Sequence, residues 1–276
     1  MSSLMMVGAS SAAGKSTVCA MLCRLMRRRG MDVVPYKTLN LSLNSFVDHD
    51  GGEMGMSQAF QAWACGLEPD CRMNPVLIKP HAEGRMQTVI AGRVADGSGL
   101  RERAFAEAMG CFRSLSDEHQ HIVVEGSGSA AEINLRHSDI ANMRTARATA
   151  SPVVIVGDID SGGVFAGIYG TYMLLPEEDR ALVKGFIINR FRGDASILDA
   201  ALRRIEEETG MRCFGVMPYL PFRLPSEDSL DMGAPGELEG EDVRGAWMDN
   251  LDRLADEAER SLDVDGLLSL MKDSTA

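Results

Sequence analysis

The sequence predicts an α/β fold in which a mostly parallel sheet carries helices on both of its faces. Apolar runs of four to six residues, such as LMMVG and VVIVG, alternate with helical segments along most of the chain. Strands that are buried on both faces show such continuous apolar runs, and their alternation with helices is typical of a parallel sheet. The length of 276 residues and the 45% hydrophobic content fit one large domain, or one with a small appendage, and exclude a disordered or fibrous protein.

Each predicted element follows from its local pattern. The first strand is predicted at residues 4–8, and a helix over residues 15–29, ended by Gly30, leads to a second strand at residues 31–37. A helix over residues 55–64 precedes two strands at 76–80 and 88–94, which we expect to pair as a small hairpin. The remaining series alternates helices at 101–115, 139–148, 164–174 and 197–209 with strands at 121–126, 152–158, 183–190 and 212–220.

Negative charge is concentrated near the C-terminus. The net charge is −12, and residues 227–265 alone hold fourteen Asp and Glu side chains. An acidic protein without a basic stripe is a poor candidate for binding nucleic acid. Proline, glycine and acidic residues mark a linker, so we divide the chain into a domain at 1–230, a linker at 231–244 and a helical segment at 245–276. The last helix is expected to dock through one apolar face and to expose its acidic face to solvent; that apolar face holds Trp247, Leu251, Leu254, Ala258 and Leu262.

The composition also bears on location and on cysteine chemistry. No apolar run approaches the roughly 20 residues of a membrane helix, and the start MSSLMMVGAS lacks the basic region of a signal peptide. We therefore expect a soluble, cytoplasmic chain with no membrane partner. The six cysteines show no CxxC spacing, which favours reduced, buried thiols over a disulfide framework or a zinc site.

The strongest chemical signal is the segment GASSAAGKST at residues 8–17, where a strand enters a loop of small residues and a helix follows. This arrangement directs backbone N–H groups and a helix N-terminus at phosphate oxygens, as in P-loop NTPases. Lys15 would neutralise the β- and γ-phosphates, and the Ser16 hydroxyl would hold Mg²⁺. Five residues, rather than the usual four, separate the two glycines. The residues predicted to bind the nucleotide here are Gly8, Ser10, Ser11, Ala12, Ala13, Gly14, Lys15, Ser16 and Thr17.

Carboxylates follow two of the predicted strands. Glu125 closes the run HIVVEG, and Asp158 and Asp160 follow the run VVIVG. One acid after a strand is often a helix cap, but ligands bind at the carboxyl edge of a parallel sheet, where these side chains converge. We therefore predict that Glu125 takes part in a Mg²⁺ site.

Six further segments carry a family resemblance. They read, in order, KTLNLSLNSFVDHDGGEMG, MNPVLIKP, VVEGSGSAAEINLRHSDIANM, GDIDSGGVFAGIYGT, VKGFIINRFRGD and PYLPFRLPSEDSL. Over residues 4–230 the chain resembles the synthetase domain of the cobyric acid synthase family, glutamine-dependent amidases of corrinoid biosynthesis. The wider superfamily includes dethiobiotin synthetase, whose phosphate loop has the same five-residue spacing.

The resemblance implies an ATP-dependent amide-forming synthetase. A substrate carboxylate attacks the γ-phosphate of ATP, and ammonia then displaces phosphate from the acyl phosphate. It implies catalytic roles for Lys15, Lys37 and Glu125, a Mg²⁺ site at Ser16 and Glu125 helped by Glu53, and adenine contacts from Asn189 and Pro218. The polar residues implied to face a corrinoid polycarboxylate are Asn40, Asn44, Gln58, Lys79, Asn134, Arg136 and Asn142. Each of these could instead make a loop hydrogen bond or a cap.

Members of this family carry a glutaminase domain with a nucleophilic cysteine, whereas no cysteine follows Cys213 here. We expect that ammonia comes from a separate glutaminase subunit or is used free, or that the chain is a fragment. The terminal segment LDRLADEAERSLDVDGLL resembles the end of longer members, which indicates an internal deletion. The resemblance leaves a homodimer open.

The sequence departs from the family at three further positions. Met56 and Ser161 stand where arginines are usual, and Arg144 replaces a glycine. Because arginines pair with carboxylates, losing two of them would weaken corrinoid binding or indicate another acceptor. Two alternatives therefore stay open: a carboxylate ligase with a different acceptor, and a nucleotide-switched regulatory ATPase that docks a partner through its acidic C-terminal helix.

Overall fold

The computed structural model describes residues 2–80, 86–221 and 243–273. Its centre is a parallel six-stranded sheet with the strand order β12-β11-β10-β1-β9-β2, which confirms the predicted fold class. The strands are β1 (Ser2–Gly8), β2 (Val33–Tyr36), β9 (His121–Ser129), β10 (Val153–Asp158), β11 (Val183–Phe191) and β12 (Arg212–Pro218).

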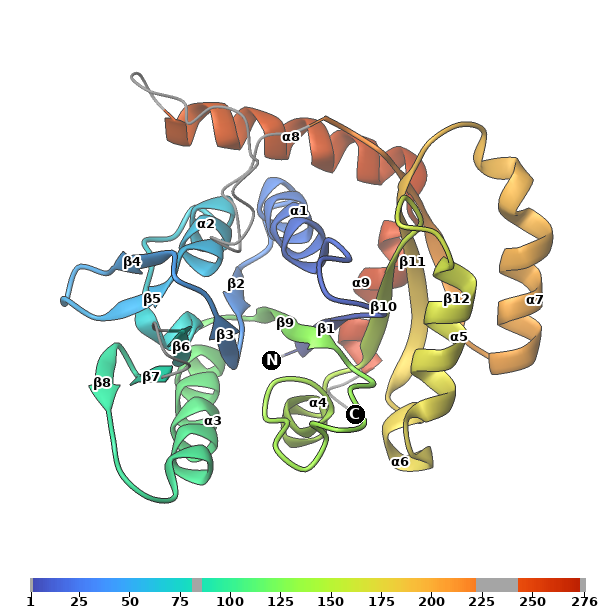
Figure 1. Ribbon diagram of the computed structural model, residues 1–276. Helices are drawn as coiled ribbons and strands as arrows, with labels where there is room; N and C mark the ends of the chain where they lie inside the picture. The colour runs from blue at the N-terminus through green and yellow to red at the C-terminus, as the bar shows by residue number, and fades with distance from the viewer. Residues whose placement is uncertain (1, 81–85, 222–242, 274–276) are drawn as a thin grey trace.

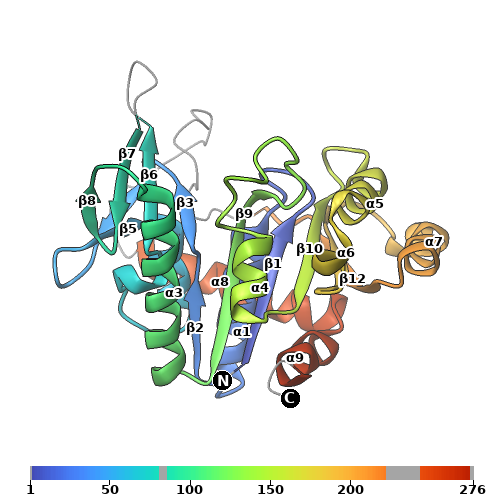
Figure 2. The same cartoon turned by 90° about the horizontal axis from the view of Figure 1, so that it is seen from below.

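Helices cover both faces of this sheet (Figures 1 and 2). On one face lie α1 (Lys15–Arg28), α8 (Val243–Ser261) and α9 (Val264–Asp273), with α2 (Met56–Ala64) beside β2. On the other lie α3 (Leu100–Glu118), α4 (Met143–Thr149), α5 (Val164–Leu174), α6 (Glu177–Arg180) and α7 (Asp199–Thr209). Because side chains alternate along a strand, Leu4 and Met6 enter the core under α1, and Met5 and Val7 enter the opposite core. The continuous apolar run of β1 is therefore explained by burial on both sides.

A smaller mixed sheet extends the edge beyond β2. It contains β3 (Leu39–Leu41), β6 (Val76–Pro80), β7 (Met86–Ile90) and β8 (Arg93–Ala95), and a separate hairpin joins β4 (Ser45–Val47) to β5 (Glu53–Gly55). The predicted pairing of 76–80 with the next run is confirmed, but the single strand predicted at 88–94 is wrong. Ala91 and Gly92 have positive φ values of 47° and 78°. This backbone forms a two-residue hairpin turn, so the run folds back on itself.

The C-terminal helices are part of the same core. Leu251, Leu254 and Ala258 of α8 are buried against α1, which confirms the predicted apolar face. The predicted exposure of the acidic face is confirmed, since the acids of α8 are exposed or half-buried, although some acids of α8 and α9 also pair with arginines of α1. The ion pairs are Arg24–Asp252 at 2.7 Å, Arg28–Asp256 at 2.6 Å and Arg29–Asp265 at 2.7 Å. Most of the predicted linker lies outside the described residues.

None of the helices in the described parts of the chain combines the length and the apolar character that crossing a membrane requires. The six cysteines are free thiols. Four of them are buried, and Cys71 and Cys213 are half-buried.

Candidate functional site

The phosphate loop connects β1 to α1 at the carboxyl edge of the sheet and needs glycine at both ends. A Cβ on Gly8 would lie 2.5 Å from the Ser10 carbonyl oxygen and 2.8 Å from that of Gly128. Gly14 has a φ of +89°, and a Cβ there would lie 2.2 Å from Asn189 Nδ2. Side chains are therefore excluded from the narrow places where the backbone turns.

The start of α1 is suited to an anion. Its N-cap Gly14 offers no side-chain cap, and its first turn holds no acidic residue. The first N–H groups of a helix lack partners within the helix, and the helix dipole favours negative charge at this end. Lys15 Nζ lies 3.0 Å from the point that a Cβ of Gly8 would occupy, so the ammonium folds back over the loop.

Glu125 is the centre of the polar network beside this loop. Its carboxylate is fully buried and accepts hydrogen bonds at Oε1 from Ser16 Oγ and Lys37 Nζ, both at 2.7 Å. At Oε2 it accepts from Gln61 Nε2 at 2.5 Å and from Gln58 Nε2 at 3.3 Å. A buried carboxylate needs such donors and a cationic partner to remain ionised. The structure thus brings together Ser16, Lys37 and Glu125, as the sequence predicts.

Gln61 is a member of this network that the sequence analysis missed. It lies three residues after Gln58 on α2, so both amides point from one helix face toward Glu125. Its Oε1 atom is buried and lacks a hydrogen-bond partner among the described residues. The spacing of two glutamines on a largely apolar helix was the available signal.

Other predicted substrate residues lie behind the site. Gln58 is fully buried, and it accepts a hydrogen bond from Asn40 Nδ2 at 3.3 Å. Asn44 lies in the loop before β4, where its carbonyl oxygen accepts a hydrogen bond from the Met56 N–H. Asn40, Asn44 and Gln58 are absent from the cavity wall described below, and their contact with substrate stays a prediction.

Glu53 and Lys79 form an ion pair on neighbouring strands at the small sheet. Lys79 Nζ also donates to Ser45 Oγ at 3.4 Å. Although partial burial opposes it, the hydrogen bond from Lys79 lowers the pKa of Glu53. The Glu53 carboxylate is thus already paired with the Lys79 ammonium, and its role in a metal site stays a prediction.

The predicted adenine residues lie at the ends of β11 and β12. Asn189 Nδ2 donates to the carbonyl oxygen of Ala13 at 3.0 Å, and Pro218 is the last residue of β12. Asp158 and Asp160, at the same sheet edge, pair with Arg190 at 2.9 Å and Arg192 at 2.8 Å.

A cavity of about 960 Å³ opens beside the phosphate loop at Ser11. Its wall is formed by the small sheet, the start of α3, the segment from 127 to 144 and the ends of α5 and α6. Apolar side chains cover much of it, among them Leu39, Val76, Ile78, Ile133, Leu135 and Leu174. The predicted substrate residues Arg136 and Asn142 line it, and Asn134 lies between two lining residues.

Four arginines also line the cavity, namely Arg101, Arg136, Arg144 and Arg147. Arg144 pairs with Glu102 at 2.5 Å and lies 3.9 Å above the Phe105 ring. The hydrogen bond from Arg144 lowers the pKa of Glu102 to about 2. Two of the other arginines, Arg136 and Arg147, share the buried Asp179. The cavity therefore combines apolar side chains with several cations, which are paired with Glu102 and Asp179.

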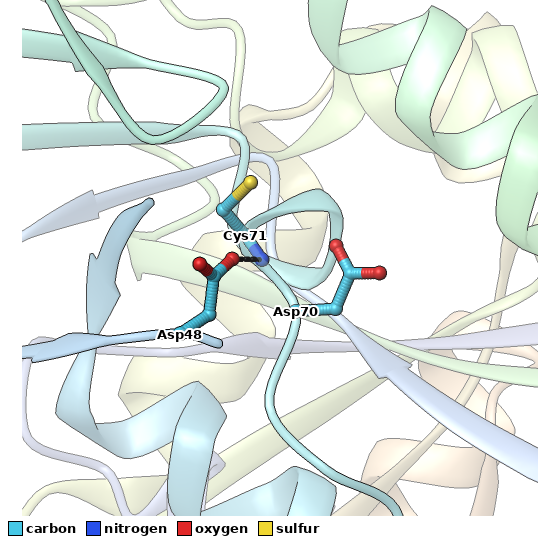
Figure 3. Close-up of side chains that lie close together, drawn as sticks. All are labelled: Asp48, Asp70 and Cys71. Carbon is cyan, nitrogen blue, oxygen red and sulfur yellow. Dashed lines mark hydrogen bonds between the residues drawn. The ribbon is translucent and has the colours of Figure 1, made fainter. Parts of the chain in front are cut away.

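A second cluster of possible ligands lies at Asp48, Asp70 and Cys71 (Figure 3). One ligand atom from each lies within 4.8 Å of the others, the only such group of three in the described residues. Asp48 accepts hydrogen bonds from the N–H groups of Cys71 at 2.9 Å and Gly52 at 2.7 Å, and Asp70 pairs with Arg72 at 2.6 Å. Burial and the neighbouring Asp48 raise the pKa of Cys71 to about 12. These contacts explain why the three side chains lie together: they belong to a turn that is stabilised by hydrogen bonds and an ion pair.

The chain is similar to several known proteins. The chain is 47% identical over 251 residues to a probable cobyric acid synthase of Archaeoglobus fulgidus, covering 86% of this chain and 53% of that protein. It is 48% identical over 237 residues to a cobyric acid synthase of Jannaschia sp., covering 83% of this chain and 49% of that protein. The chain thus spans about half the length of the curated relatives it matches. A solved structure of chloroplast FtsY from Physcomitrella patens matches with a TM-score of 0.48 and 16% identity, covering 80% of this chain and 59% of that chain.

The sequence profile of the "CobQ/CobB/MinD/ParA nucleotide binding domain" matches residues 4–229, which include the phosphate loop, Lys37, Glu125 and Asn189. This range begins within β1 and extends past the end of β12, so it contains nearly all of the central sheet. The chain belongs to the CobQ/CobB/MinD/ParA nucleotide-binding domain family.

Proposed function

We propose that this protein is an ATP-dependent amide-forming synthetase that acts on a corrinoid-type polycarboxylate. The observation that carries the proposal is the cavity of about 960 Å³ that meets the phosphate loop at Ser11. A large apolar wall that also holds four arginines suits a bulky ligand with an apolar body and carboxylates at its edge. The relatives named cobyric acid synthase support the same assignment.

The residues at the loop fit Mg-ATP. The Ser16 hydroxyl and the Glu125 carboxylate are oxygen ligands of the kind that Mg²⁺ prefers, and they lie 2.7 Å apart. Glycines at both ends leave room for phosphates close to the backbone. When bound, Mg²⁺ would neutralise charge on the phosphates and on the transferring phosphoryl group. Lys15 and the first N–H groups of α1 would hold the phosphates.

The reaction would proceed in two steps. An oxygen of the acceptor carboxylate bonds to the γ-phosphorus, the bond to the bridging oxygen breaks and ADP leaves. Ammonia then bonds to the carbonyl carbon of the acyl phosphate, phosphate leaves and one proton is lost from nitrogen. The protein supplies position and charge, and Lys37, buried beside Glu125, would meet the phosphoryl group or the acceptor carboxylate. Ammonia would come from a separate glutaminase or from solution.

ADP release with Mg-ATP and ammonium, with and without cobyrinic acid diamide, tests the proposal. We expect corrinoid-dependent ADP release and an amidated product by mass spectrometry. Lys15→Ala should abolish turnover, whereas Lys184→Ala, which removes an exposed lysine bonded to the Ala181 carbonyl oxygen, should have no effect. ADP release that no corrinoid acid changes in the presence of ammonium would contradict the proposal.

A carboxylate ligase with a different acceptor is the second candidate, because Met56 and Ser161 replace arginines usual in the family. Ser161 lies beside Asp158, to which its hydroxyl donates a hydrogen bond at 3.1 Å. A thermal-shift screen of carboxylic acids with Mg-ATP separates the two candidates, since a bound acceptor stabilises the fold. A regulatory ATPase that docks a partner through α8 has less support, because acids of that helix pair with α1.

A further inference from the structure

The end of β11 contacts the phosphate loop through two consecutive residues. Asn189 Nδ2 donates to the Ala13 carbonyl oxygen at 3.0 Å. Arg190 Nη1 donates to the Ala12 carbonyl oxygen at 3.1 Å. We propose that Asn189 and Arg190 are positioning residues that hold the phosphate loop in its phosphate-binding shape. The proposal rests on the nucleotide-binding part of the proposed function and is independent of the acceptor.

The orientation of the peptide groups supplies the physical reason. In a planar trans peptide the C=O bond and the following N–H bond point in opposite directions. Anchoring the carbonyls of Ala12 and Ala13 on β11 therefore turns the N–H groups of Ala13 and Gly14 away from that strand. Backbone N–H groups in such a loop are its phosphate donors. The two hydrogen bonds thus determine which side of the loop offers donors.

The backbones of Ala12 and Arg190 both have positive φ values, in the left-handed region of the Ramachandran plot. Ala12 has a φ of 57° and Arg190 a φ of 62°. Positive φ is unfavourable for residues with a Cβ, and it persists where surrounding contacts hold it. Here the Arg190 side chain bonds to the carbonyl of Ala12, so one strained residue holds the other. Strained residues of this kind cluster at functional sites.

Asn189 and Arg190 are in turn fixed to β10. Arg190 Nη1 donates to Asp158 Oδ2 at 2.9 Å, and that carboxylate is 6% exposed. The Arg190 N–H donates to Asn189 Oδ1 at 3.0 Å, and the Ile159 N–H to the Asn189 carbonyl oxygen at 3.1 Å. Each polar atom of the Asn189 amide thus makes one hydrogen bond within the protein, and one N–H and one lone pair remain. The observed bonds fix the loop, and the adenine contact that the sequence analysis assigned to Asn189 stays a prediction.

Binding of Mg-ATP and of Mg-tripolyphosphate, measured by isothermal titration calorimetry, distinguishes these two roles. If Asn189 holds the loop, Asn189→Ala weakens both ligands by the same factor, about tenfold for one lost hydrogen bond of average strength. If Asn189 holds adenine, ATP binding falls while tripolyphosphate binding is unchanged. That second result would overturn the proposal.

Arg190→Met, which keeps the length of the side chain, should likewise weaken both ligands equally. Arg192→Ala is the matched control, because Arg192 pairs with exposed Asp160 and stacks on Tyr219, neither of which belongs to the phosphate loop. Its tripolyphosphate affinity should equal that of the wild type. If Asn189→Ala fails to fold, the Arg190→Met comparison alone decides, and unchanged tripolyphosphate binding there would also overturn the proposal. Wild-type protein that binds neither ligand would contradict the nucleotide site itself, a distinguishable failure.

Discussion

Replacing Lys37 by Met tests the buried pair at the centre of the site. Lys37 Nζ lies 2.7 Å from Glu125 Oε1, and the side chains are 3% and 0% exposed. The substitution keeps most of the volume but leaves the carboxylate with neutral donors from Ser16 and two glutamines. Removing one partner of a buried ion pair costs about 3–5 kcal/mol, because the other charge stays desolvated. Since three donors remain, we expect a loss of about 3 kcal/mol in the free energy of unfolding.

The double variant separates charge from packing. Glu125→Gln alone leaves the ammonium without its carboxylate and should cost a similar amount. Lys37→Met with Glu125→Gln removes both charges, so its loss should be at least about 2 kcal/mol smaller than the sum of the single losses. Lys184→Met is the matched control, and its effect should stay within about 0.5 kcal/mol because that lysine is exposed.

The assay is urea unfolding without nucleotide, followed by the fluorescence of Trp63 and Trp247, the two tryptophans of the chain. Additive losses in the double variant would refute the reasoning, since they would show that the two groups do not interact. A neutral effect of Glu125→Gln would also refute it, because it would mean that Glu125 is already protonated and uncharged.

Three further predictions concern the cavity and the C-terminal helices. Arg144 lines the cavity, so Arg144→Gly should raise the KM for the carboxylate acceptor about tenfold and leave kcat unchanged in steady-state kinetics. An unchanged KM would exclude Arg144 from acceptor binding. Leu251→Ala should lower the free energy of unfolding by about 2–4 kcal/mol in a urea titration, because Leu251 is fully buried between α8 and α1; a loss below about 1 kcal/mol would indicate loose docking. The hydrogen bond from Arg24 lowers the pKa of Asp252 in the folded protein. The stabilisation that this carboxylate gives to the folded state is therefore fully present above the unfolded pKa of about 3.9, and it is lost as the pH falls through the lower folded pKa. Since Asp252 is 37% exposed, Asp252→Asn should cost only about 0.5 kcal/mol at pH 7, and the difference from wild type should vanish near pH 2 in pH-dependent unfolding.

The central sheet was predictable because each strand is buried on both faces and therefore shows an unbroken apolar run. The small sheet was not, since β3, β4 and β5 have three residues each and mix polar with apolar side chains. Strands that short carry too few residues for a periodic pattern. Their pairing depends on contacts such as Leu39 with Val76, which lie far apart in sequence.

In the candidate site, too, some residues could be placed from the sequence and others could not. Ser16 and Glu125 were expected at one Mg²⁺ site from the phosphate-loop pattern and the sheet edge, and the resemblance implied a role for Lys37; the structure places the three side chains together. Gln58 and Asn40 were expected at the substrate, and that contact stays a prediction; the structure shows both buried, with Gln58 bonded to Glu125. A sequence shows that a helix carries an amide; it does not show whether that helix face turns toward the solvent or toward a buried carboxylate.

The acidic C-terminal segment makes ion pairs that its composition alone did not predict. Its carboxylates meet Arg24, Arg28 and Arg29, which lie more than 220 positions earlier, and no local pattern links the two segments. The same helix α1 begins at the phosphate loop with Lys15 and presents these arginines farther along its length. Docking of α8 therefore restrains the helix that follows the phosphate loop. Loosening that interface should lower stability and weaken phosphate binding, because the loop leads directly into α1, which presents Arg24 and Arg28 to α8.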